Sequence, residues 1–129
     1  MKTKILIDTD ILIDISREII KAIERIKQEE LNYQLSISII TKIELNIGCR
    51  NKREAEKLKE FLQRFYLINI DNNISNQASE LIEKYHLSHG LLIADAFIAA
   101  TAISFNLPLL SKNQKDYRFI TELNLLPYP

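Results

Sequence analysis

The sequence predicts an α/β fold in which helices cover both faces of a central, mostly parallel sheet of about five short strands. Short apolar runs alternate along the chain with longer amphipathic stretches, which is the pattern of strand–helix–strand units. The first run, Ile5-Leu6-Ile7, is apolar at every position, as expected for a strand buried on both faces. With 129 residues, 47% of them hydrophobic and only 2 Gly, the chain has the size and content of one packed domain spanning residues 1–129.

The elements follow one another with short connections. We expect strands at residues 5–7, 35–39, 66–70 and 108–111, with a last strand near Leu125. We expect helices at residues 11–15, 17–31, 40–47, 52–65, 72–87 and 92–105, with a short helical piece at 116–121. Asp10 and Ser16 are the expected N-caps of the first two helices, and Gly48 suits the end of the third. The helix at 92–105 is rich in Ala and carries little charge, which indicates deep burial.

Charge and cysteine content restrict the classes of partner. The 17 basic and 17 acidic residues cancel, so any surface that binds nucleic acid must be local. Cys49 is the only cysteine, which excludes an intrachain disulfide and fits a reducing cytoplasm. The N-terminus reaches Asp8 after three apolar residues, too short for a signal peptide, and the near-apolar run at 90–105 is shorter than a membrane span. We therefore expect a soluble cytoplasmic protein without membrane contact.

Four acids stand at positions that a shared site would use. Asp8 directly follows the first strand, Glu44 lies one helical turn past the second, and Asp116 follows the fourth after a short polar loop. In open α/β sheets, ligands gather beyond the carboxyl ends of the strands. Asp95 lies inside the most apolar helix, where a lone carboxylate is costly unless it is paired or binds a metal. The combination predicts a metal site built from all four acids.

Each acid also has a structural interpretation. Asp8 could be a turn residue, and Asp116 a solvated loop acid. Thr41 and Glu44 match the capping box, in which Glu reaches back to a backbone N–H. Asp95 could belong to the first turn of its helix, if that helix begins at residue 93 or 94. No single position carries the case for a site.

Taken together, four segments resemble the PIN-domain ribonucleases, in particular the VapC-like toxins of toxin–antitoxin pairs. The resemblance covers nearly the whole chain and rests on residues 5–12, 38–45 with Gly48 at the usual offset, 93–102 and 110–117. The chain departs from the common pattern at Asp10, Ser111 and Tyr117, where Asn, Thr and Phe are frequent. Asn113 could share or replace the function of Asp116.

The resemblance implies a three-layer α/β/α nuclease domain, an RNA substrate, a homodimer and a small antitoxin partner. Mg²⁺ and Mn²⁺ prefer oxygen ligands, which the four carboxylates supply. The chain has only two His and one Cys, at scattered spacings, which disfavours a zinc site. We expect Asp8 and Asp95 to be the main ligands, with Glu44 and Asp116 completing the site directly or through water. The metal would activate a water for attack on a phosphodiester.

Other polar residues of these segments are candidates for RNA contacts. Thr9, Ser111 and Asn113 could bind the phosphate or hold the carboxylates, although Ser111 could equally be a strand-end hydroxyl. Lys112 and Lys115, together with Arg118, flank the fourth segment and could neutralise phosphates. A second basic group, Arg50, Lys52 and Arg53, fits a solvated charged face at least as well. The apolar stripe of the helix at 52–65 could be where a partner docks.

Three other functions stay open at this point. The chain could be a housekeeping RNA-processing nuclease instead of a toxin. An Mg²⁺-dependent phosphatase would use Asp8 and Asp10 as nucleophile and acid, but it leaves Glu44 and Asp95 without a function. A catalytically silent RNA- or protein-binding domain would not require all four acids.

Overall fold

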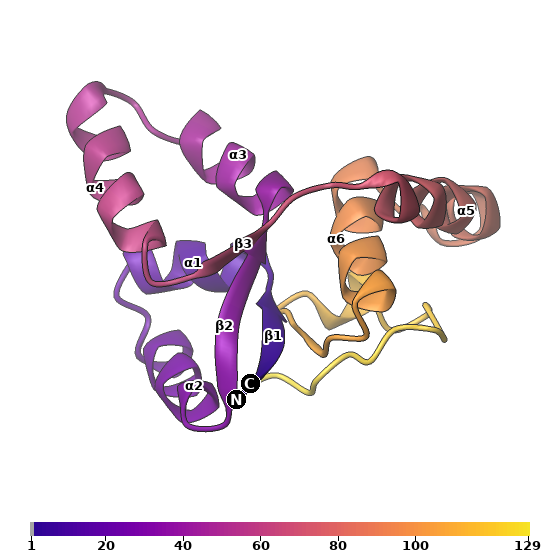
Figure 1. Cartoon of the computed structure of the whole chain (residues 1–129), viewed down its shortest axis with the longest axis horizontal. Coiled ribbons are helices and arrows are strands. Elements are labelled where there is room, and N and C mark those ends of the chain that lie inside the picture. The colour runs from indigo at the N-terminus through magenta and orange to yellow at the C-terminus, as the bar shows by residue number, and fades with distance from the viewer. Residues whose placement is uncertain (1) are drawn as a thin grey trace.

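Helices cover both faces of a four-stranded parallel sheet in the computed structural model, which describes residues 2–129 (Figure 1). The strands are β1 (Thr3–Ile7), β2 (Tyr33–Ser38), β3 (Tyr66–Ile68) and β4 (Leu109–Leu110). The helices are α1 (Thr9–Ser16), α2 (Ile20–Glu30), α3 (Ile39–Ile47), α4 (Lys52–Leu62), α5 (Asn72–His89) and α6 (Ile93–Ser104), with a 3₁₀ turn, η1, at Gln114–Asp116. The strand order is β3-β2-β1-β4, which makes β1 the strand that pairs with both β2 and β4.

Strand β1 shows why its three central residues are all apolar. Leu6 packs into the core on one face, with α5 and α6, whereas Ile5 and Ile7 pack into the core on the other face, with α1 and α2. Side chains alternate between the two faces of a strand, so a strand covered on both sides is apolar throughout. Figure 1 shows the two helical layers on opposite sides of the strands. The predicted three-layer α/β/α architecture is confirmed.

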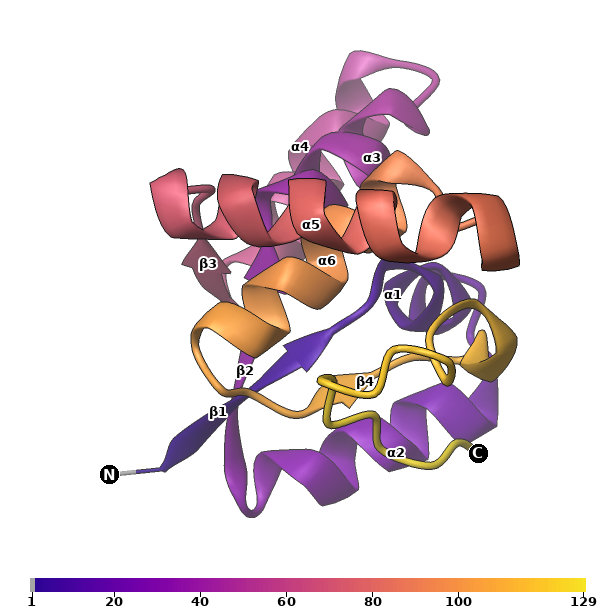
Figure 2. The same cartoon turned by 90° about the vertical axis from the view of Figure 1, so that its right-hand side faces the viewer.

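The C-terminal segment lies beside α2. Figure 2 shows this segment, in yellow, running past β4 and along α2. Tyr128 packs in the core with the α1 and α2 residues, and the guanidinium of Arg25 in α2 lies 5.8 Å from the centre of its ring. The predicted strand near Leu125 is wrong as a strand, because Leu125 forms only an isolated parallel bridge with Leu109. The backbone contact consists of two hydrogen bonds of 2.9 Å, from the N–H of Leu109 to the carbonyl of Asn124 and from the N–H of Leu126 to the carbonyl of Leu109.

The predicted helix at residues 17–31 is also wrong in its start. Ser16 is the last residue of α1 and donates from its hydroxyl to the carbonyl of Ile13 over 2.6 Å, so it does not cap α2. Glu18 has a φ of 59°, a left-handed conformation that interrupts the helical path. The N-cap of α2 is Ile19, which makes no side-chain capping bond. The other α-helices begin and end within three residues of their predicted bounds, whereas the helical piece predicted at 116–121 is wrong, because the only helical turn described there is η1 at Gln114–Asp116.

The glycines end helices in two different ways. Gly90 follows α5 with a φ of 70°, the left-handed C-terminal conformation that glycine adopts without steric cost. Gly48 ends α3, as predicted, but with a φ of −73° that any residue can adopt. Within residues 2–129, none of the helices combines the length and the apolarity that crossing a bilayer requires.

Candidate metal and nucleic-acid site

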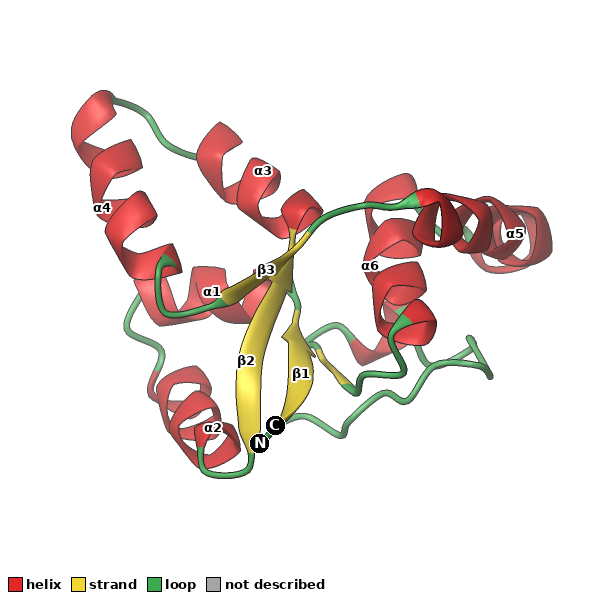
Figure 3. Cartoon of the chain, in the orientation of Figure 1, coloured by secondary structure: helices red, strands yellow, loops and turns green. Residues whose placement is uncertain are grey.

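The four predicted acids lie around the carboxyl ends of the strands. Asp8 follows β1 and begins α1, and Glu44 lies on α3, which continues directly from β2. The connection after β4 leads through Ser111 to η1, where Asp116 lies, and Asp95 lies in the first turn of α6. Figure 3 shows the strands, in yellow, pointing toward α1 and α3 at this edge. α6 packs against α3, which brings its first turn to the same region.

Asp8 is buried and held by two donors. Its side chain is 5% exposed, and its two carboxylate oxygens accept from the backbone N–H of Thr9 over 2.8 Å and from the hydroxyl of Ser111 over 2.7 Å. Asp8 is also the N-cap of α1, so the helix N-terminus partly compensates its charge. Burial raises the pKa of Asp8 to about 7, and the nearby negative charge of Asp10 adds to the rise.

Asp10 does not have the function that the sequence suggested. The N-cap of α1 is Asp8, and Asp10 lies inside the first turn of the helix. Its Oδ2 accepts from the backbone N–H of Lys112 over 3.1 Å and of Asn113 over 3.0 Å, and the hydroxyl of Ser111 lies 3.3 Å away. Its Oδ1 is buried and has no hydrogen-bond partner. Burial raises the pKa of Asp10.

Glu44 is attached to α1 through Thr9. The Thr9 hydroxyl donates to Glu44 Oε1 over 2.7 Å and lies 2.9 Å from the hydroxyl of Thr41. A hydroxyl has one proton, so Thr41 donates to Thr9 while Thr9 donates to Glu44. The capping-box interpretation is wrong, because the N-cap of α3 is Ser38, which accepts from the N–H of Ile40 over 3.1 Å. Glu44 therefore points to α1 and not back to its own helix.

Asp95 is paired with Tyr117, which was not among the predicted site residues. The helix begins at Ile93, so Asp95 lies in its first turn and is half-buried. The buried Tyr117 donates from its hydroxyl to Asp95 Oδ1 over 3.1 Å. Burial raises the pKa of Asp95, and the charges of Asp116, Glu44 and Asp10 raise it further. The only sequence signal for Tyr117 was an aromatic residue next to the last acid.

Tyr117 also connects the two acids that we expected to be the main ligands. Burial raises the pKa of its hydroxyl well above the usual value, and the negative charges of Asp8 and Asp95 act in the same direction. Asp8 and Asp95 therefore both lie close to one buried phenol. The charges of Glu44, Asp116 and Asp10 act on Asp95, and the charge of Asp10 acts on Asp8, with Asp116 exposed at the edge.

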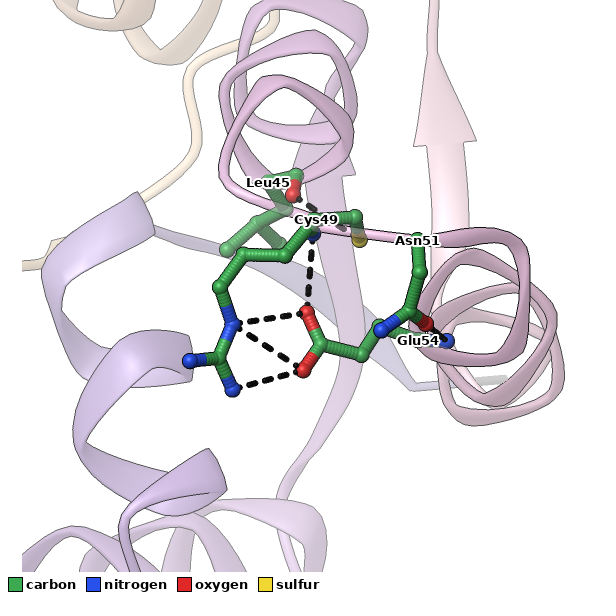
Figure 4. A network of polar contacts seen from close by, with 5 residues as sticks. Leu45, Cys49, Asn51 and Glu54 are labelled. Atoms are coloured by element: carbon green, nitrogen blue, oxygen red, sulfur yellow. Dashed lines mark hydrogen bonds and ion pairs between the residues drawn. The ribbon is translucent and has the colours of Figure 1, made fainter.

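Some of the predicted basic residues form ion pairs, and the others are exposed to solvent. Lys112 forms an ion pair with the buried Asp14 of α1, 3.1 Å between Nζ and Oδ2. Lys115 and Arg118 are exposed near Asp116. In the α3–α4 connection, Arg50 pairs with Glu54 over 2.9 Å, and Glu54 donates its N–H to the N-cap Asn51 (Figure 4). Lys52 and Arg53 are exposed, so this second basic group is largely a solvated face.

The acidic side chains that could bind a metal ion at this edge of the sheet all offer oxygen atoms as ligands. Within residues 2–129, no group of three or more His, Cys, Asp or Glu side chains is arranged to hold a metal ion as the side chains stand. None of the ion pairs found in this part of the chain involves Asp8, Asp10, Glu44, Asp95 or Asp116. Carboxylates that gather without a basic partner match the preference of hard divalent cations for oxygen and for added negative charge.

Comparisons with known proteins identify close similarity along the whole fold. A family model described as PIN domain matches residues 5–120. A protein named Ribonuclease VapC1, from Methanocaldococcus jannaschii, is 34% identical over 129 residues, which cover 98% of this chain and 88% of that protein.

Solved structures give the same picture. VapBC2 from Rickettsia felis, bound to a DNA fragment from its promoter, is 25% identical with a TM-score of 0.83, over 98% of this chain and 100% of that one. A toxin–antitoxin complex from Klebsiella pneumoniae is 29% identical with a TM-score of 0.78, over 96% of this chain and 97% of that one.

Proposed function

The chain belongs to the PIN domain family, and on this premise we propose that it is a metal-dependent ribonuclease that cuts RNA phosphodiester bonds as the toxin of a toxin–antitoxin pair. The observation that supports the chemistry most directly is the convergence of Asp8, Glu44, Asp95 and Asp116 from four separate elements. The similarity to Ribonuclease VapC1 along almost the whole chain supports RNA as the substrate. We treat residues 1–129 as one nuclease domain, and a cytoplasmic location remains a prediction.

We propose Mg²⁺ or Mn²⁺ as the cofactor. Mg²⁺ in proteins is held by one or two carboxylates and keeps several of its waters. A site of this kind needs no three side chains in direct contact with one ion. We therefore assign Asp8 and Asp95 as direct ligands, and Glu44 and Asp116 as ligands either directly or through water. When bound, the ion supplies an activated water for attack on the phosphodiester and stabilises the charge on the leaving oxygen.

The protein's own hydroxyl groups hold these carboxylates in place. Ser111 donates to Asp8, Tyr117 to Asp95 and Thr9 to Glu44. Donors of this kind fix the orientation of a ligand and tune its basicity. Of the residues predicted to contact RNA, Thr9 and Ser111 therefore act as positioning residues for the carboxylates.

RNA contacts fall to the residues at the rim of the site. Lys115 and the side chain of Asn113 are exposed beside Asp116 and can reach a phosphate. Lys112 is tied to Asp14 and contributes only if that ion pair opens. The rim thus offers fewer basic contacts to RNA than the sequence alone suggested.

An RNA-cleavage assay with purified protein tests this function. We expect wild-type protein with Mn²⁺ or Mg²⁺ to cut a labelled RNA, with no cutting in chelator or by Asp95→Asn. Glu83→Gln on α5, which removes an exposed carboxylate outside the site, is the matched control and should cut normally. Cutting by Asp95→Asn at the wild-type rate would show that the site is wrong. RNA binding without cutting by the wild-type protein would favour a silent binding domain.

The same preparation distinguishes a nuclease from a phosphatase. A phosphatase would release phosphate from small monoesters and would need Asp10 as its acid. We expect no such release from the wild-type protein. Phosphate release that Asp10→Asn destroys would replace the nuclease assignment.

We further propose a small antitoxin as partner, as in the toxin–antitoxin complexes that the chain resembles. Helix α4 has no buried residue and is flanked by two grooves of about 510 and 810 Å³, both of which include the half-buried Leu58. We propose that the antitoxin covers these grooves with an apolar segment.

Co-expression with the protein of a short, overlapping upstream reading frame tests the partner. Leu58→Asp should abolish co-elution, and Glu60→Gln, an exposed change on the same helix, should preserve it. Absence of such a reading frame would favour a housekeeping nuclease. A homodimer remains a prediction that the elution volume of the toxin alone decides.

A further inference from the structure

We propose that Asp10 is a positioning residue, whose carboxylate fastens the loop after β4 to helix α1 and thereby sets the geometry of Asp8 and Asp116. This role rests on the proposed function, because Asp10 would hold two of the four acids of that site in their positions. It assigns to Asp10 neither metal ligation nor proton transfer.

A single oxygen of Asp10 accepts from the backbone N–H groups of two consecutive residues. Oδ2 accepts from the backbone N–H groups of Lys112 and Asn113 at 3.1 and 3.0 Å, and lies 3.3 Å from the Ser111 hydroxyl. Asp10 and these donors are more than 100 residues apart in the sequence. Backbone N–H groups in a loop have no ladder partner, so a carboxylate that accepts from two of them fixes the path of the loop.

This path controls the partner of Asp8. Ser111 is completely buried, and its hydroxyl donates to Asp8 Oδ2 over 2.7 Å. The N–H of Asn113 lies 3.2 Å from the same hydroxyl oxygen, in addition to its bond with Asp10. The loop thus wraps around Ser111 and keeps its oxygen on Asp8. Without the contact to Asp10, no acceptor on α1 would hold the backbone N–H groups of this loop, and its remaining contacts with α1 would be side-chain ones, from Ser111 to Asp8 and from Lys112 to Asp14.

The same loop carries the fourth acid. Asn113 precedes η1, and its carbonyl accepts from the N–H of Asp116 over 3.1 Å. Asp116 is exposed, and no hydrogen bond of its side chain is found within residues 2–129. Its position therefore depends on the backbone that leads to it. Asp10 fixes that backbone three residues before Asp116.

Asp14 provides a comparison within the same helix. It lies four residues after Asp10 and contacts the same loop, but through the side chain of Lys112, which is 50% exposed. Both Asp10→Ala and Asp14→Ala remove one negative charge from α1 at this loop. Only Asp10→Ala removes an acceptor of backbone N–H groups. A difference between the two variants therefore reports the backbone contact and not the charge.

The experiment measures amide hydrogen exchange and RNA cleavage in Asp10→Ala, Asp10→Asn and Asp14→Ala. In chelator, we expect the amides of Lys112 and Asn113 to exchange faster in Asp10→Ala than in wild type, and to stay protected in the other two variants. With saturating Mn²⁺, kcat should fall by about 10- to 100-fold in Asp10→Ala with little change in KM. Asp10→Asn should restore the rate, because its amide oxygen still accepts from both N–H groups.

Several results would overturn the proposal. Wild-type exchange in Asp10→Ala would show that the loop does not depend on Asp10. A loss in Asp10→Asn as large as in Asp10→Ala would mean that the charge is needed, and an equal loss in Asp14→Ala would mean that any loop contact suffices. If Asp10→Ala does not fold, Asp10→Ser, whose hydroxyl is one bond shorter, takes its place. A wild-type protein that cuts no RNA would refute the proposed function, while the exchange data would still decide on Asp10.

Discussion

The hydroxyl of Tyr117 donates to Asp95 Oδ1 over 3.1 Å, and it joins the start of α6 to the turn that follows η1. Tyr117 is completely buried, and the charge of Asp8 acts on the same hydroxyl. The phenol has one proton, which it donates to Asp95, and it stays neutral close to both carboxylates.

Replacing Tyr117 by Phe should weaken metal binding without unfolding the protein. Phe fills the same volume but removes the donor that lowers the pKa of Asp95, so the pKa of that carboxyl should rise. A ligand must lose its proton to bind a metal, so affinity should fall most at low pH. We expect the Mn²⁺ dissociation constant at pH 6.5 to rise roughly 10-fold, with a smaller change at pH 8. Calorimetric titration at both pH values measures it, and an equal affinity at pH 6.5 would remove Tyr117 from the site.

Replacing Asp95 by Asn should relieve repulsion in the metal-free protein. The charges of Asp116, Glu44 and Asp10 all disfavour ionised Asp95, so the metal-free variant should melt at or above the wild-type temperature. Metal should stabilise wild type by about 2.7 kcal/mol when it is a hundredfold above its dissociation constant, and Asp95→Asn by less. Thermal melts in chelator and in excess Mn²⁺ decide this. An undiminished metal shift in the variant would contradict the assignment of Asp95 as a ligand.

The stability of the metal-free protein should fall as pH rises from about 4 to above 7. Burial raises the pKa of Asp8 from 3.8 to about 7, so in this window the folded state keeps a proton that the unfolded state has lost. Stability is therefore greatest below the unfolded pKa and is lost as pH passes through the folded one, by at most about 4 kcal/mol.

Melting temperatures in chelator between pH 4 and 8 measure this loss. Asp8→Asn should show a smaller decline, because it carries no titrating group at this position. Excess Mn²⁺ should reduce or reverse the decline in wild type, since binding favours the ionised carboxylate. The same decline in wild type and Asp8→Asn would contradict the prediction.

Replacing Thr9 by Val should destabilise the fold and loosen Glu44. Val keeps the shape of Thr9 but removes the hydroxyl, which leaves the fully buried Thr41 without that partner and Glu44 without its donor. The expected cost is about 1 to 3 kcal/mol in the free energy of unfolding. Urea denaturation measures it, with Thr9→Ser as the control that retains the hydroxyl. A Val variant as stable as wild type would show that the hydroxyl contributes nothing to stability.

The sequence by itself determined the layers of the fold and the identity of the four acids. The apolar run of β1 and the Ala-rich α6 follow from burial on two faces, and burial is a property that local composition records. Asp95 was proposed for the site because a lone carboxylate inside an apolar helix is costly, and Asp8 because it directly follows the first strand. The helix starts at Ser16 and Asp10 were misplaced, since several residues near each start can cap and only the chain path selects one.

Only the tertiary structure decided which donor holds which acid. The contacts of Tyr117 with Asp95, Thr9 with Glu44, and Ser111 with Asp8 join residues 22, 35 and 103 positions apart. Local periodicity carries no information about such distant pairs. They form because parallel strands bring their carboxyl ends to one edge of the sheet, where α1, α3, α6 and the loop after β4 meet. For the same reason the hydrogen bonds of Asp10 to the backbone of the 111–113 loop could not be predicted from the sequence, in which Asp10 resembles an ordinary helix cap.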